Sequence, residues 1–155
     1  MQRWTEPQEQ RQPPDGSPGW VESWAFEFAA ADGSFGGLLR MERQPVPGRV
    51  VLWAQFVHDQ WGYVLVREDE LADESPHLEV RGSLWAAAIC EEPLSRWTLG
   101  LESFGVQFAR GEETEAWDRE FGGVVALGFD LSFDDDVPGP AGGEDLVIDT
   151  GYARW

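Results

Sequence analysis

Four side chains that can move or stabilise a proton alternate with aromatic residues along this chain. They are Glu22, His58, Tyr63 and Glu102. A glutamate buried among apolar side chains can act as a general acid near neutral pH, and a histidine can transfer a proton in either direction. A tyrosine can donate a hydrogen bond to a carbonyl or a developing oxyanion. We take these four as catalytic candidates. The alternative is that each is an ordinary strand or hairpin residue facing water.

The residues expected around these groups are mostly aromatic. Alternation with period two places Glu22 on one strand face with Trp24, and Glu102 on one face with Phe104. The nine Trp and nine Phe residues exceed what a solid core needs, which favours a cavity for an apolar guest. Alternatively, the rings fill the core or cover a dimer interface. The predicted ligand-contacting residues are Trp24, Phe26, Trp53, Gln55, Trp85 and Phe104.

The stretch ICEEPLSRW holds the single cysteine of the chain beside two glutamates. Cys90 ends an apolar run and Pro93 closes the strand, so we expect an inert thiol at a strand corner, with both carboxylates at the rim. The two histidines are too few for a metal site, and the acidic runs lack the spacing of a calcium loop. We therefore predict no metal and no cofactor.

The elements that position these residues are short strands. Residues 1–19 are rich in Gln, Pro and Gly and are predicted to form a flexible arm, whereas residues 20–155 form a single domain. Hairpin signals such as Asp32-Gly33 separate about 8–10 strands, and one short helix is expected at 111–120. This pattern predicts an all-β, lipocalin-like, antiparallel up-and-down β-barrel, which removes its edges by closure.

The charge of the chain excludes some classes of partner. A formal net charge of -18 disfavours nucleic acid and anionic membrane surfaces. All 11 basic residues are arginine, so a Schiff-base lysine is excluded. No apolar run reaches the length of about 20 residues that spans a membrane, and the start does not resemble a secretory signal. We expect a cytoplasmic protein that binds an apolar small molecule, with a homodimer as an open alternative.

Two stretches, ESWAFEFAAADGSFGGLLRMERQP and ICEEPLSRWTLGLESFGV, resemble the lipocalin-like family of carotenoid 1,2-hydratase and AttH-type proteins. The resemblance covers residues from about 20 to 133 and rests on aromatic spacing and the Glu-Glu-Pro…Trp segment. It implies a β-barrel whose apolar cavity acts on polyene-like or terpenoid molecules, by hydration in some members and by Diels–Alder cyclisation in fungal relatives. Typical members carry two barrels in tandem and this chain matches one, so no catalytic residue is carried over.

Two functions follow as expectations. The first is a cofactor-independent enzyme that encloses an apolar, unsaturated metabolite, such as a polyketide or terpenoid, and promotes its cyclisation, isomerisation or hydration. The second is a binding or carrier protein with the same cavity and no chemistry. A third option is a structural domain whose exposed tryptophans dock a second subunit.

Overall fold

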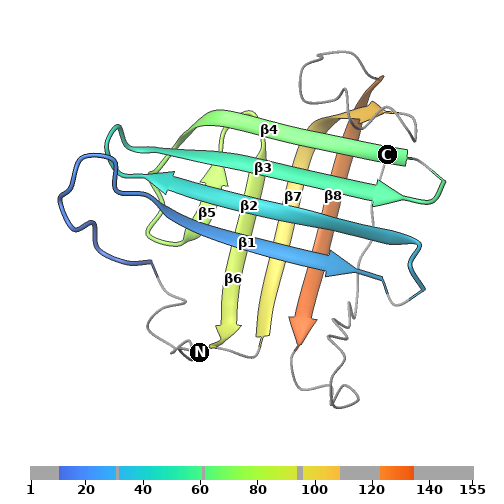
Figure 1. Ribbon diagram of the computed structural model, residues 1–155, viewed down its shortest axis with the longest axis horizontal. Coiled ribbons are helices and arrows are strands. Elements are labelled where there is room, and N and C mark those ends of the chain that lie inside the picture. The colour runs from blue at the N-terminus through green and yellow to red at the C-terminus, as the bar shows by residue number, and fades with distance from the viewer. Residues whose placement is uncertain (1–10, 31, 61, 94–95, 109–122, 135–155) are drawn as a thin grey trace.

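The computed structural model describes residues 11–30, 32–60, 62–93, 96–108 and 123–134. Within these ranges the chain is all-β and antiparallel (Figure 1), and none of the described residues belongs to a helix that could cross a membrane. The predicted helix at 111–120 and a last strand at 146–155 lie outside the described residues. The strands are β1 (Glu22–Ala29), β2 (Phe35–Gln44), β3 (Arg49–His58), β4 (Gly62–Ala72), β5 (Leu78–Arg81), β6 (Trp85–Glu92), β7 (Arg96–Phe108) and β8 (Gly123–Asp134).

Two hairpin meanders build one curled sheet. β1 to β4 pair in chain order, and so do β5 to β8. The meanders are joined where β4 pairs with the end of β7, through Tyr63–Leu65 and Val106–Phe108. In Figure 1, β1 to β4 run side by side across the front and β6 to β8 cross steeply behind them. The sheet is therefore a half-barrel, which confirms the lipocalin-like fold class, although β4 pairs with β7 rather than with β5.

The hairpins form where the sequence predicts them. Gly33 lies between β1 and β2 with φ +73°, and Gly48 lies between β2 and β3 with φ +86°, a backbone region that favours glycine. The Ser34 hydroxyl and amide donate to Asp32 Oδ1 at 2.6 and 2.9 Å. These bonds hold the pKa of the Asp32 carboxyl below its ordinary value. Gly82 separates β5 from β6, so the segment 77–90 forms two strands rather than one.

The core lies between the two layers, and alternation is clearest on β3, where every second residue fills it. On β3 the buried set is Val50, Leu52, Ala54 and Phe56, and on β7 it includes Leu99 and Leu101. Phenylalanines join the layers, because the rings of Phe56 and Phe129 meet edge to face with centroids 5.0 Å apart. The tryptophans, by contrast, are only half-buried at the described positions, which are Trp20, Trp24, Trp53, Trp85 and Trp97.

Gly37 on β2 is required by this phenylalanine packing. A Cβ there would lie 2.6 Å from the Gln55 carbonyl oxygen and 2.8 Å from both Phe28 Cζ and Phe56 Cδ1. We predict that Gly37→Ala lowers the free energy of unfolding by about 1–3 kcal/mol, the usual cost of overpacking. Urea denaturation would measure it.

Gly128→Ala on β8 is the matched control. Its Cβ would meet nothing closer than the Leu101 carbonyl oxygen at 3.7 Å, so the added methyl fits. This variant should be neutral or stabilised by up to about 1 kcal/mol, because alanine restricts the unfolded chain. Equal destabilisation of both variants would contradict the packing argument.

Candidate functional site

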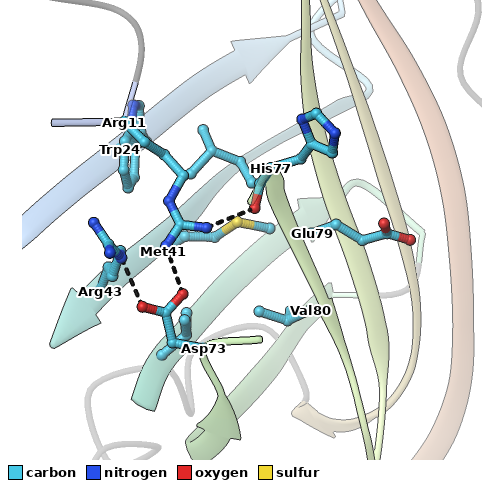
Figure 2. A pocket seen from close by; sticks show the side chains of 10 residues that line it. Arg11, Trp24, Met41, Arg43, Asp73, His77, Glu79 and Val80 are labelled. Carbon is cyan, nitrogen blue, oxygen red and sulfur yellow. Dashed lines mark hydrogen bonds and ion pairs between the residues drawn. The ribbon is translucent and has the colours of Figure 1, made fainter. Parts of the chain in front are cut away.

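A small hollow opens at one end of the half-barrel (Figure 2). Its volume is about 10 Å³, enough for about one water molecule. The floor is apolar and the rim is charged, so the site combines a surface for an apolar group with groups that could orient a polar one. The floor consists of Trp24, Met41, Val50, Leu78 and Val80, and the rim of Arg11, Arg43, Asp73, His77 and Glu79.

Asp73 is the centre of the rim and is shared by two arginines. Arg11 Nη2 donates to Asp73 Oδ1 at 2.7 Å, and Arg43 Nε donates to Asp73 Oδ2 at 2.6 Å. Figure 2 shows both guanidinium groups pointing toward this carboxylate. The side chains of Asp73, Arg43 and Arg11 are 9%, 15% and 18% exposed, so these ion pairs are better shielded from water than ordinary surface pairs.

Arg11 and Gln12 come from the segment before β1, and Arg11 lines the hollow. We call these two residues the strap. The Arg11 guanidinium also donates through Nη1 to the carbonyl oxygens of Ser75 and His77, the latter at 3.3 Å. Although the sequence predicts a flexible arm over residues 1–19, the strap is fastened to the body of the protein at these positions.

Glu22 and Arg43 hold the second residue of the strap. The backbone amide of Gln12 donates to Glu22 Oε1 at 2.6 Å, and Arg43 Nη1 donates to the backbone carbonyl oxygen of Gln12 at 3.3 Å. Arg43 also pairs with Glu22 Oε2 at 3.4 Å and lies 5.9 Å from the centre of the Trp20 ring, within range of a cation–π contact. The predicted acid Glu22 is thus an anchor for the strap.

The other catalytic candidates do not join Glu22. His58 lies at the opposite end of β3, where its Nδ1 accepts a hydrogen bond from the Gln60 amide at 3.1 Å. Tyr63 donates a short hydrogen bond to Gln55 Oε1 on the outer face of the sheet. That face points away from the core because Ala54, Phe56 and Val64, the alternating residues, fill the inside.

Glu102 and most of the predicted cavity wall also lie outside. Glu102 is exposed and opposite Trp85, and Phe104 is 70% exposed, so it cannot line the interior. Trp53 and Gln55 point outward for the same reason of alternation. Trp24 and Phe26 do face inward: Trp24 lines the hollow, and the Phe26 ring lies 5.2 Å from that of Trp97.

The corner at Cys90 agrees with the sequence analysis in part. β6 ends at Glu92, directly before Pro93, and Glu92 lies 3.5 Å from Arg96 in an exposed ion pair. Glu91 accepts a hydrogen bond from the Thr98 hydroxyl at 3.0 Å. The thiol itself is half-buried.

None of the five rim residues was among the sequence candidates. Arg43 carried a usable signal, because it alternates with Leu39 and Met41 on the inner face of β2, where a charged group needs a partner. Arg11 and Asp73 carried none. They are 62 residues apart in the chain, and only the fold brings them together.

No set of three or more histidine, cysteine or acidic side chains in the described ranges is placed to hold a metal ion. Comparisons with protein-family models, with curated proteins and with solved structures found no significant match. The resemblance to the carotenoid 1,2-hydratase and AttH-type family therefore stays a prediction.

Removal of the Asp73 charge tests the rim. In Asp73→Asn two guanidinium groups lose their shared carboxylate, so we expect the free energy of unfolding to fall by about 2 kcal/mol, less than for a fully buried pair. Thermal or urea denaturation would measure the change. Asp69→Asn is the control, because its partner Arg67 is 61% exposed, and the loss should be much smaller. Equal losses would argue against a structural role for the rim.

Glu79 provides a test by titration. The Trp85 indole donates to Glu79 Oε1 at 3.0 Å and Arg81 donates to the same oxygen at 2.6 Å, which lowers the pKa of Glu79 below its ordinary value of 4.5. Because the pKa of Glu79 is lower in the folded state, its ionised carboxylate stabilises the fold at pH values above the pKa of the unfolded chain. This stabilisation is lost as the pH falls through the pKa of the folded state. Trp85→Phe should raise the pKa of Glu79 in a carboxyl NMR titration. Trp53→Phe, on β3, should leave it unchanged, and no difference between the variants would contradict this assignment.

Proposed function

We propose that this protein is a non-catalytic, lipocalin-like binding protein for a small, largely apolar metabolite. The proposal rests on one observation, an apolar floor beneath a charged rim, where Arg11 of the strap is bonded to Asp73. Such a combination is typical of small-molecule sites, in which apolar surface supplies affinity and a few polar groups supply orientation.

A ligand larger than a water molecule needs the hollow to widen, and the strap is the part that can move with least disruption. Arg11 and Gln12 precede β1 and belong to no strand, so their displacement breaks no ladder of the sheet. Asp73 would keep its bond to Arg43 Nε at 2.6 Å and would not be left as an unpaired buried charge. Opening therefore costs the strap contacts and leaves the ion pair between Asp73 and Arg43 in place.

Binding is favoured over catalysis by the positions of the catalytic candidates. Glu22 is engaged by Arg43 and the strap, His58 lies at the other end of β3, and Glu102 is on the outer face. A reacting molecule in the hollow would therefore contact neither His58 nor Glu102. Cyclisation, isomerisation or hydration of an unsaturated substrate stays a prediction, which an assay of turnover would test.

A neutral dye tests the proposed function. We expect Nile red to bind the full-length protein with one saturable site and a rise in its fluorescence. Trp24→Ala should weaken this binding by about tenfold, because the indole is part of the floor and its loss removes apolar contact worth about 1.4 kcal/mol.

Trp53→Ala is the matched control. It removes an indole from the outer face of β3, outside the hollow, and should leave the affinity unchanged. Equal weakening in both variants, or no saturable binding by the unmodified protein, would overturn the proposal. Normal near-ultraviolet circular dichroism of each variant would show that it is folded.

A further inference from the structure

We infer that the ligand carries a cationic head, a guanidinium or a primary ammonium group, and that it takes the position now held by the Arg11 guanidinium. The inference rests on the proposed function and extends it to a class of ligand. Arg11 then acts as an internal ligand, which the cation displaces together with the rest of the strap.

The groups around the Arg11 guanidinium are hydrogen-bond acceptors. They are the Asp73 carboxylate at 2.7 Å, the Ser75 carbonyl oxygen, and the His77 carbonyl oxygen at 3.3 Å. This combination suits a group that has several N–H donors and no acceptor, as guanidinium and ammonium groups do. A carboxylate or phosphate in the same position would face acceptors and gain no hydrogen bond from them.

The charge that remains after the strap opens also favours a cation. Arg43 contributes one positive charge, while Asp73 and Glu22 contribute two negative charges, so this group has a net charge of -1 once Arg11 leaves. At long range the net charge of -18 on the whole chain raises the local concentration of cations.

The rest of the ligand is apolar. Trp24 and Met41 line the same hollow as Arg11, and Val80 continues the floor. A molecule with a cationic head and a short hydrocarbon body would bury its body on this floor while its head bonded to Asp73. An amphipathic cation therefore satisfies both halves of the site.

The strap sets the affinity through competition. Because Arg11 is tethered to the site, its effective concentration there is high, on the order of millimolar for a short flexible link. An external cation binds only the fraction of molecules whose site is open, which weakens its apparent affinity by that fraction. Removal of the Arg11 charge should therefore strengthen the binding of a cation.

The test uses n-octylguanidinium, n-octyl sulfate and n-octanol, titrated into the full-length protein by calorimetry. We expect the guanidinium to bind at least about tenfold more tightly than the sulfate. Arg11→Gln should increase the affinity for n-octylguanidinium by about tenfold. Asp73→Asn should abolish the preference for n-octylguanidinium over n-octyl sulfate. Arg40→Gln is the control, because Arg40 is an exposed arginine of β2 paired with Glu42, and its loss changes the net charge by the same amount without touching the rim.

A second measurement needs no variant. The Gln12 amide is bonded to Glu22 Oε1 at 2.6 Å, so displacement of the strap should speed hydrogen exchange at Gln12 and shift its NMR signal as n-octylguanidinium saturates the protein. This measurement decides the matter if Arg11→Gln fails to fold.

The outcomes separate the two proposals. If n-octylguanidinium and n-octyl sulfate bind equally well, or Arg11→Gln behaves like Arg40→Gln, the cationic head is wrong while binding of Nile red still supports the proposed function. If Gln12 exchange is unchanged at saturation, the strap is not displaced and the inference fails. If neither Nile red nor any of the three octyl compounds binds, the proposed function fails as well.

Discussion

Three residue pairs between β4 and β7 hold the two meanders of this protein in one sheet. Gly105 lies at this joint, where a Cβ would come within 2.6 Å of Val64 Cγ1, so a close approach of the strands depends on the absence of a side chain. Each meander contributes one apolar face to the core, and without the other meander that face would be exposed to water. The curvature of the half-barrel, and with it the position of its open end, therefore depends on this short ladder.

At that open end, the protein closes its core with charge instead of apolar contact. Asp73 directly follows β4 and Arg43 lies near the end of β2, and the strap adds Arg11 from outside the sheet. Asp73 and Arg43 each have a second charged partner in this network, so displacement of Arg11 leaves neither of them unpaired.

The sequence predicted the strands and turns well because alternation and glycine position act locally. It could not tell which face of β3 points inward, since Leu52 and Trp53 are both apolar and only packing against the other layer decides between them. The same ambiguity on β7 placed Glu102 and Phe104 among the site candidates. The rim could not be predicted for another reason. Its ion pairs join Asp73 to Arg11 and Arg43, which are 62 and 30 positions away in the chain, and no local sequence pattern encodes such pairs.

The strap is fastened by arginine in a chain that contains no lysine. A guanidinium group keeps its charge at any pH at which proteins stay folded, whereas an ammonium group loses its proton in alkaline solution. Arg11 is held by the Asp73 carboxylate and by two backbone carbonyl oxygens, so none of its contacts depends on a lysine ammonium group. Under the proposed competition, the trigger that opens the site is therefore a dissolved cation, and not a rise in pH.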